Sequence, residues 1–205
     1  MSPHKISAIL FDMGNVLVEF KPSSIVAHFC SDESTIARLT QEIFLKDEWK
    51  ALDMGLITEK DAEASICIRV PAQDHPLIHQ IIASWPQAMI IKKEMIPLVK
   101  QLKAMGYRLF LASNASNRFY EYQDTIEALK SFDGILISAQ IHQIKPRLAF
   151  YEALLLRFHL EPGDCLLIDD LSANILGAAQ AGMEGIVFDG QLDHVVQALQ
   201  GKGIL

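Results

Sequence analysis

Beyond residue 94 the chain alternates between amphipathic stretches and short apolar runs, a pattern typical of βα units that build a parallel sheet. Residues 94–105 place apolar side chains three and four positions apart and stop before Gly106, which predicts a helix with a glycine at its C-terminus. The later predicted helices are one that contains Tyr120, Ile126 and Leu129, one over 148–158, and one over 172–182 with Ser172 as its N-cap. The predicted strands are 6–11, 107–114, 134–139, 165–170 and 185–189.

Residues 21–92 show several helical periods and no convincing strand. The stretches 34–52 and 58–70 are predicted as helical, and Thr58 occupies the position of an N-cap for the second. A helical block inserted after the first strand would lie over the strand ends as a cap. We therefore expect two domains, a core of residues 1–17 and 94–205 and a helical cap of residues 18–93.

The composition describes a compact α/β protein. A chain of 205 residues, 50% hydrophobic and 21% charged, is long enough for one core domain that carries a smaller insertion. Its net charge of -7 argues against a general nucleic-acid binder, because phosphate backbones require clustered Lys and Arg. No apolar run approaches the roughly 18 residues of a membrane span, so we expect no membrane partner and a cytoplasmic location. The oligomeric state stays open.

Polar side chains stand at the ends of four predicted strands or just beyond them. Ligands of an open parallel sheet bind at the carboxyl ends of the strands, beside the point where the strand order reverses. Each side chain alone is also compatible with an ordinary turn or helix cap, so the prediction depends on their combination at one edge. The set comprises Asp12, Ser113 with Asn114, Lys145, and Asp169 with Asp170.

Three carboxylates at one edge of a sheet require a positive charge between them. At an effective dielectric of about 20, two carboxylates about 4 Å apart repel by roughly 4 kcal/mol. Oxygen ligands alone select a hard cation, and Mg²⁺, which accepts one or two carboxylates together with water and phosphate, fits best. Lys145 supplies a second positive centre, while the Ser113 hydroxyl and nearby backbone amides can bind anionic oxygens. The pattern therefore predicts a site for an anion beside a metal.

The same segments resemble the four sequence motifs of the haloacid dehalogenase-like (HAD) hydrolase superfamily. The matching segments, in order, are FDMGNVL around Asp12, LASN at Ser113, IKP at Lys145 and IDDLSANILGAAQAGM from Ile168. Their order, their spacing and the helical insertion, which is similar to a type-one cap, extend the resemblance over nearly the whole chain. The resemblance implies a Rossmann-like, doubly wound parallel sheet with an inserted helical cap.

The resemblance also implies a Mg²⁺-dependent phosphatase that acts on a small phosphorylated metabolite. Asp12 would attack phosphorus in line, and water would later hydrolyse the resulting aspartyl-phosphate. Mg²⁺ would be held by the Asp12 side chain, the backbone carbonyl of Gly14 and the Asp170 side chain. Asp169 would be adjacent or also a ligand.

The resemblance also implies which residues would bind the transferred phosphoryl group and which residue would orient them. Ser113, Asn114 and Lys145 would bind the phosphoryl oxygens, and Lys145 would also offset the repulsion between phosphate and Asp12. Asn174 would orient these residues through hydrogen bonds.

Motif I departs from the common family pattern at Gly14. Most family phosphatases have a second Asp there, which protonates the leaving oxygen and typically contributes about 10² to 10⁴ in rate. FDMGNV nevertheless resembles the Gly-Asn variant of a bacterial subgroup that includes an α-glucose-1-phosphate phosphatase, and MGLITEKDAEASI resembles that subgroup's cap. We therefore expect a leaving oxygen that needs little help, with a sugar 1-phosphate as one candidate. His142, where relatives often have Gly, either narrows the pocket or lies on the surface.

Two other functions stay open at this point. A 2-haloacid dehalogenase-like hydrolase would use Asp12 on carbon without a metal, although relatives of that type usually have Tyr at the position of Gly14 and lack the paired acids of motif IV. A non-catalytic ligand-binding protein is favoured by Gly14 and disfavoured by the intact Asp12, Lys145 and Asp170.

Aromatic residues recur in the predicted cap. Trp49, Trp85 and Phe44 are expected mainly in its core. Phe20 and Trp49 could also line the cap side of the pocket, where the substrate would be selected.

Overall fold

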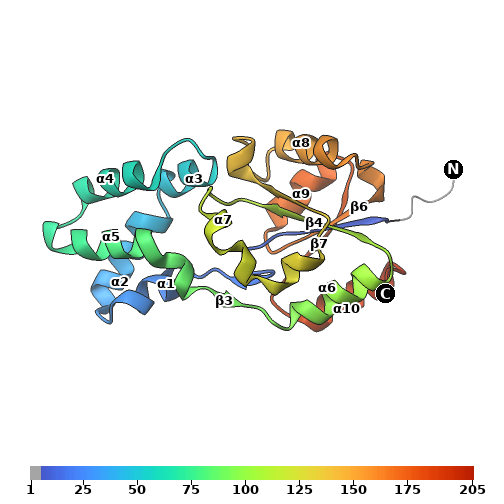
Figure 1. Cartoon of the computed structure of the whole chain (residues 1–205), viewed down its shortest axis with the longest axis horizontal. Helices are drawn as coiled ribbons and strands as arrows, with labels where there is room; N and C mark the ends of the chain where they lie inside the picture. The colour runs from blue at the N-terminus through green and yellow to red at the C-terminus, as the bar shows by residue number, and fades with distance from the viewer. Residues whose placement is uncertain (1–5) are drawn as a thin grey trace.

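A five-stranded parallel sheet forms the centre of the protein, whose computed structural model describes residues 6–205 (Figure 1). The first five residues of the predicted core segment 1–17 lie outside the described part. The strand order is β5-β4-β1-β6-β7, and all pairings are parallel. The strands are β1 (Ala8–Phe11), β4 (Arg108–Ser113), β5 (Gly134–Ile137), β6 (Cys165–Asp169) and β7 (Glu184–Val187). All five predicted strands, and with them the α/β fold, are confirmed.

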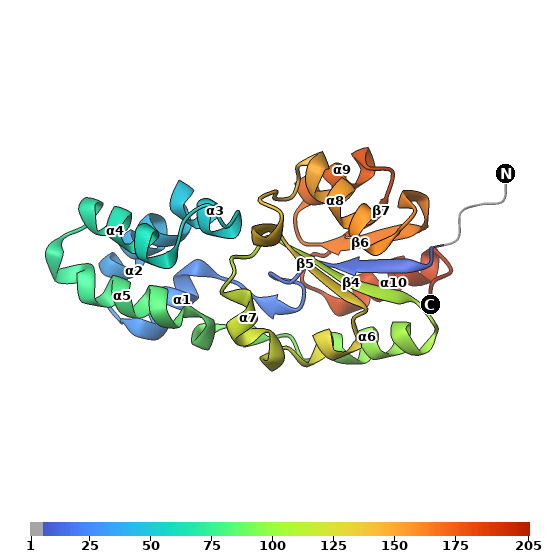
Figure 2. The same cartoon turned by 45° about the horizontal axis from the view of Figure 1, so that its top comes forward.

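Alternate residues of each strand face opposite sides of the sheet, and both sides are covered. Ile9 and Phe11 belong to one hydrophobic cluster, and Ala8 and Leu10 belong to the other. Figures 1 and 2 show helices against both faces of the sheet. These helices are α6 (Met95–Ala104) and α10 (Leu192–Gly201) on one face, and α8 (Leu148–Phe158) and α9 (Ser172–Gln180) on the other. Burial on both faces explains why the strands are almost continuously apolar.

The strand order reverses beside β1. From β1 the chain passes to β4 and then outward to β5, and it returns to the other side of β1 as β6 before it reaches β7. The carboxyl ends of β1 and β6 therefore flank the crevice in which doubly wound sheets bind their ligands.

The helices α1 to α5 form a second unit beside the sheet, on the left in Figure 1, which we call the five-helix unit. They are α1 (Pro22–Phe29), α2 (Glu33–Leu39), α3 (Asp47–Asp53), α4 (Glu59–Arg69) and α5 (His75–Ser84). The predicted N-cap Thr58 is confirmed, because its hydroxyl accepts from the Asp61 N–H while the Asp61 carboxylate accepts from the Thr58 N–H. No helix within residues 6–205 is both long enough and apolar enough to cross a bilayer.

A short antiparallel ribbon links the five-helix unit to the sheet. Its strands are β2 (Val18–Glu19) and β3 (Ile90–Ile91). The prediction that 21–92 contains no strand is therefore wrong at two residues, because runs of two are too short to show a period in the sequence.

The predicted helix over 34–52 is broken in the structure. A π-helical turn, Thr40–Phe44, follows α2, and Lys46 is extended immediately before α3. Phe44 and Trp49 would point to different sides of a continuous helix. Because of the break, the two ring centroids lie 4.4 Å apart, and both rings pack in the same hydrophobic interior.

The region of Tyr120, Ile126 and Leu129 is not a helix as predicted. Only α7 (Phe119–Tyr122) is helical there, and the residues after it form the 3₁₀ turns Gln123–Thr125 and Glu127–Ser131. The Thr125 hydroxyl donates to the Tyr122 carbonyl at 2.7 Å, a local bond that competes with helix continuation.

The predicted N-cap Ser172 is also corrected. Ser172 is the first residue of α9, and Leu171 occupies the N-cap position without a side-chain cap bond. The Leu171 N–H instead donates to the Asp169 carboxylate at 2.9 Å, so the turn before α9 belongs to the site at the sheet edge.

Candidate active site

The carboxyl ends of β1 and β6 bring three carboxylates together. Asp12 follows β1, Asp169 ends β6, and Asp170 comes next. One oxygen from each of the three lies within 4.8 Å of the other two. A set of hard oxygen donors at this spacing fits a divalent cation such as Mg²⁺ better than any softer metal.

Lys145 lies buried between two of these carboxylates. Its Nζ is 2.9 Å from Asp12 Oδ1 and 2.6 Å from Asp169 Oδ2, and the residue is 2% exposed. Burial alone would lower the pKa of Lys145, but the charges of Asp12 and Asp169 outweigh it and raise the pKa. Burial raises the pKa of Asp12 to about 6, although Lys145 acts in the opposite direction. The lysine is therefore a fixed positive charge beside Asp12.

The two acids of motif IV have different surroundings. Asp169 is fully buried, and its carboxylate accepts hydrogen bonds from Lys145 Nζ, the Leu171 N–H and Asn174 Nδ2. Asp170 is only partly buried, and burial raises its pKa. The oxygens of Asp169 are thus committed to the protein, while Asp170 stays accessible to a ligand.

Asn174 holds Asp169 in place. Its Nδ2 lies 2.9 Å from Asp169 Oδ1 and 3.0 Å from Oδ2, and its own backbone carbonyl accepts from the Tyr151 hydroxyl at 2.6 Å. Asn174 therefore has the contacts that the expected orienting role requires.

Asn15 is part of the site and was not among the predicted site residues. Its backbone is left-handed, with φ 56°, which Asn tolerates better than most residues. Its Nδ2 donates to Asp170 Oδ2 at 2.9 Å, and its Oδ1 accepts from the Phe20 N–H at 3.0 Å. The Gly-Asn pair after β1 indicated a turn in the sequence, but nothing there indicated the partner at position 170.

The two polar residues after β4 take different positions. Ser113 is 1% exposed, ends β4 and lines the same cavity as Asp12. Asn114 bonds the main chain of Lys145, with Oδ1 accepting from its N–H at 2.8 Å and Nδ2 donating to its carbonyl at 3.1 Å. The Asn114 side chain thus holds the lysine segment, and the expected contact of Asn114 with phosphoryl oxygens stays a prediction.

A cavity of about 230 Å³ lies between these residues and the five-helix unit. Its lower part is polar, with Asp12, Ser113 and Lys145. Its upper part is aromatic: Phe20, Trp49, Trp85 and Tyr122. Neighbouring rings lie 5.4 to 5.8 Å apart, centroid to centroid. The prediction that Phe20 and Trp49 line the pocket is confirmed, and Trp85, expected mainly in the cap core, lines it too.

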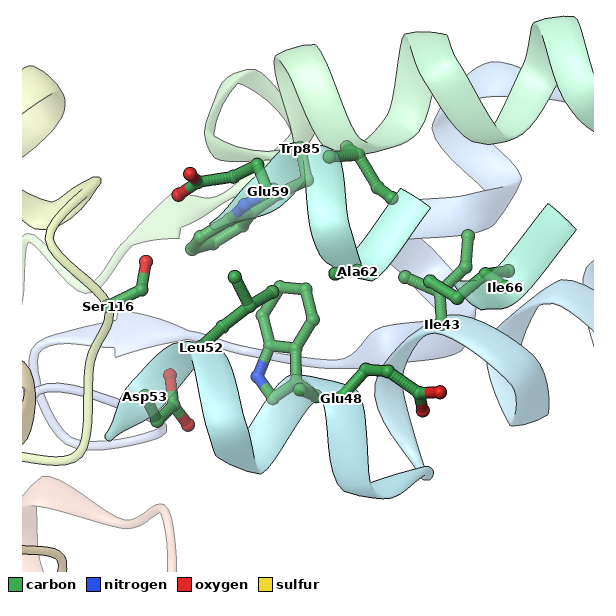
Figure 3. A pocket seen from close by; sticks show the side chains of 11 residues that line it. Ile43, Glu48, Leu52, Asp53, Glu59, Ala62, Ile66, Trp85 and Ser116 are labelled. Atoms are coloured by element: carbon green, nitrogen blue, oxygen red, sulfur yellow. The ribbon is translucent and has the colours of Figure 1, made fainter. Parts of the chain in front are cut away.

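Asp53 brings a further carboxylate into the cavity from the end of α3. Figure 3 shows it on the same helix as Glu48 and Leu52, facing the loop that carries Ser116. Burial, and after it the charge of Asp12, raises the pKa of Asp53 to about 7, while a backbone hydrogen bond from Ser116 lowers it in part. In the sequence Asp53 is only an acid at the end of an amphipathic stretch, so no local signal identified it.

The segment 53–55 is fixed against the core. The Ser138 hydroxyl donates to the Asp53 carbonyl and accepts from the Ala115 N–H, the latter at 2.9 Å. Gly55 has φ 65°, and an added Cβ would lie 2.9 Å from the Ala139 carbonyl oxygen. Only glycine allows this close approach without a backbone shift.

His142 lies on the surface, as the second of the two expectations for this residue had it, and not in the pocket. Its backbone is left-handed, with φ 55°, and its side chain is exposed. Its Nδ1 is 2.8 Å from the Met54 carbonyl oxygen, so Nδ1 donates to the five-helix unit. The residue supports the contact between the two units and does not narrow the cavity.

A Gly177→Ala substitution tests how tightly the lysine segment is held. A Cβ at Gly177 would overlap the Pro146 carbonyl and come within 2.9 Å of the Tyr151 ring. We expect a loss of about 1–3 kcal/mol in the free energy of unfolding, measured with urea, and a lower reaction rate because Lys145 shifts. The control is Gly201→Ala, where an added Cβ meets no atom of residues 6–205 within 4 Å. Equal stability of the two variants would contradict the close packing.

Comparison with known proteins places the chain among related sequences and folds. A family model described as haloacid dehalogenase-like hydrolase matches residues 6–182. The sesquiterpene phosphatase AstK of Aspergillus oryzae is 25% identical over 185 residues, which are 87% of this chain and 88% of AstK.

Solved structures show the same fold. The HAD family enzyme BT-2542 of Bacteroides thetaiotaomicron has a TM-score of 0.72 at 18% identity, over 94% of this chain and 98% of that one. Its complex with magnesium and inorganic phosphate has a TM-score of 0.68 at 18% identity, over 93% and 98%. The L-2-haloacid dehalogenase of Xanthobacter autotrophicus, with chloropropionic acid covalently bound, has a TM-score of 0.66 at 14% identity, over 98% and 84%. The fold alone therefore does not separate phosphatase from dehalogenase.

Proposed function

Since the chain belongs to the haloacid dehalogenase-like hydrolases, we propose that it is a Mg²⁺-dependent phosphatase that acts on small phosphorylated metabolites. The observation that carries this proposal is the cluster at the sheet edge, where Asp12 meets Lys145 and the acids of motif IV. Dehalogenation on carbon needs no metal, whereas a paired acid set suits a divalent cation and a phosphate.

Asp12 is the proposed nucleophile. One of its oxygens forms a bond to phosphorus as the bond between phosphorus and the leaving oxygen breaks, and water later hydrolyses this aspartyl-phosphate. Lys145, 2.9 Å from Asp12, reduces the repulsion between the attacking carboxylate and the phosphate. The Ser113 hydroxyl, buried at the end of β4, donates to a phosphoryl oxygen.

The proposed ligands of Mg²⁺ are the Asp12 side chain, the Gly14 carbonyl and the Asp170 side chain. When bound, the ion would neutralise charge on the phosphoryl oxygens. Asp170 is preferred over Asp169 because the Asp169 oxygens already accept hydrogen bonds from Lys145 and Asn174. Asp169 therefore serves to hold Lys145 in place, and Asn15 orients Asp170.

The aromatic upper part of the cavity favours a substrate whose organic group has an apolar face. The five-helix unit, which we propose as a cap of residues 18–93, supplies Trp49 and Trp85. A sugar 1-phosphate is one candidate, because the resemblance of motif I implies it and sugar rings stack on aromatic side chains. A prenyl-type monophosphate is a second candidate, since the rings are apolar and AstK is named a sesquiterpene phosphatase.

A substrate panel tests the proposal through release of inorganic phosphate. We expect release from at least one sugar or prenyl monophosphate with Mg²⁺, and a loss of at least about 10²-fold when EDTA removes the metal. Added Mg²⁺ in excess of EDTA should restore the rate. Chloride release from 2-chloropropionate in EDTA would favour the dehalogenase, and the absence of turnover on every substrate would favour a non-catalytic binding protein.

A further inference from the structure

We propose that Asp53, supplied by the five-helix unit, is the acid and base of the reaction, in place of the side chain that Gly14 lacks. This inference rests on the phosphatase function proposed above. It adds a catalytic residue that lies outside the four motif segments.

The residues that line the cavity offer few groups able to protonate a leaving oxygen. Asp12 is the nucleophile, and Lys145 is paired with two carboxylates. Tyr122 also lines the cavity, but burial and the charge of Asp53 raise its pKa well above the usual range, so it gives up a proton poorly near neutral pH. Asp53 is the remaining titratable side chain among those that line this cavity.

The position of Asp53 is determined by main-chain contacts on both sides. The Ser138 hydroxyl, itself fully buried, bonds the Asp53 carbonyl, and Gly55 packs against Ala139. A backbone hydrogen bond from Ser116 reaches the Asp53 carboxylate. These contacts with the core hold the Asp53 side chain over the cavity. A carboxylate that served only solubility would not need such contacts.

The protonation of Asp53 fits the role. An ionised carboxylate beside a bound phosphate would be repelled, whereas a protonated carboxyl donates a hydrogen bond to the leaving oxygen. Burial is the largest cause that raises the pKa of the Asp53 carboxyl, so the cavity favours the protonated form that donates this bond.

The two half-reactions balance with Asp53 as the only proton carrier. In the first, the Asp12 oxygen bonds to phosphorus, the leaving oxygen departs, and the Asp53 proton passes to it, which yields the alcohol. In the second, the Asp53 carboxylate takes a proton from water while the water oxygen attacks phosphorus. Asp12 returns as a carboxylate, inorganic phosphate is released, and Asp53 is protonated again.

Dependence on the leaving group separates proton transfer from a structural role. Asp53→Asn keeps the size and hydrogen bonding of the side chain but cannot transfer a proton. We expect the first half-reaction with an alkyl phosphate, measured in a single turnover, to slow about 10² to 10³-fold, because an alkoxide must be protonated as it leaves. With p-nitrophenyl phosphate, whose leaving group is weakly basic, the first half-reaction should slow by less than about 10-fold in a single turnover.

The matched control is Asp47→Asn, which removes a carboxylate from the first turn of the same helix. It should leave both substrates at the wild-type rate. An equal slowing of the first half-reaction on both substrates in Asp53→Asn, or no slowing on either, would overturn the role of Asp53. A wild-type protein that hydrolyses p-nitrophenyl phosphate and no alkyl phosphate would overturn it as well.

The same assays distinguish failure of this inference from failure of the proposed function. If the wild-type protein releases phosphate with Mg²⁺ from neither of these substrates and from no sugar or prenyl monophosphate of the panel, the phosphatase proposal itself fails. If both substrates are hydrolysed and the ratio of their rates is unchanged in Asp53→Asn, the function stands and only the assignment of Asp53 fails.

Discussion

Asp12→Asn should reduce phosphate release by at least about 10⁴-fold while substrate binding is retained. Asn has nearly the size of Asp but no carboxylate to form the bond to phosphorus, so the two-step reaction has no first step. Lys145 keeps its 2.6 Å contact with Asp169, so the fold should be preserved. The measurement is single-turnover phosphate release with Mg²⁺, together with a thermal unfolding curve.

The control for this substitution is Asp189→Asn. Asp189 is exposed, and its carboxylate bonds the Gln191 N–H and the nearby His194 at the start of α10. The Asp189→Asn substitution should leave the rate of phosphate release unchanged. If Asp12→Asn kept more than about 1% of the wild-type activity after any contaminating phosphatase is subtracted, Asp12 would not be the nucleophile.

Lys145→Met should lower the free energy of unfolding by about 3–5 kcal/mol, because it leaves two buried carboxylates without their positive partner. Activity should fall by at least about 10³-fold, since the remaining charge repels the phosphate. Stability is measured by urea unfolding in EDTA, so that no cation replaces the lysine.

Lys202→Met is the matched control for Lys145→Met. Lys202 also forms an ion pair, with Glu184, but the pair lies at the surface, where water already solvates both charges. The change in stability should be small. A Lys145 variant no less stable than this control would show that the buried carboxylates are not balanced by the lysine.

Local patterns in the sequence were sufficient for the sheet and for the charged groups at its edge. Each strand is a short apolar run, and Asp12, Lys145 and Asp169 follow or end such runs at positions that a parallel sheet must bring together. The sheet order then places the ends of β1 and β6 side by side, which no single segment could show.

Contacts between distant segments were not predictable in the same way. The Asn114 side chain bonds Lys145, Asn15 bonds Asp170, and Asp53 lines the same cavity as Asp12. Each contact depends on how loops far apart in the chain meet, and the polar residue involved is also a common turn or helix-end residue. The broken helix after Leu39 has the same origin, because the packing of Phe44 on Trp49 outweighs local helical preference.

The ribbon of β2 and β3 carries both passages of the chain between the sheet and the five-helix unit, while α3 touches the core elsewhere (Figure 1). A rotation of the five-helix unit about that ribbon would separate Asp53 from Ser138 but leave Asp12 and Lys145 where they are. An open conformation would therefore hold a nucleophile without its proton donor. Substrate exchange and bond cleavage would then belong to different stages of the turnover cycle.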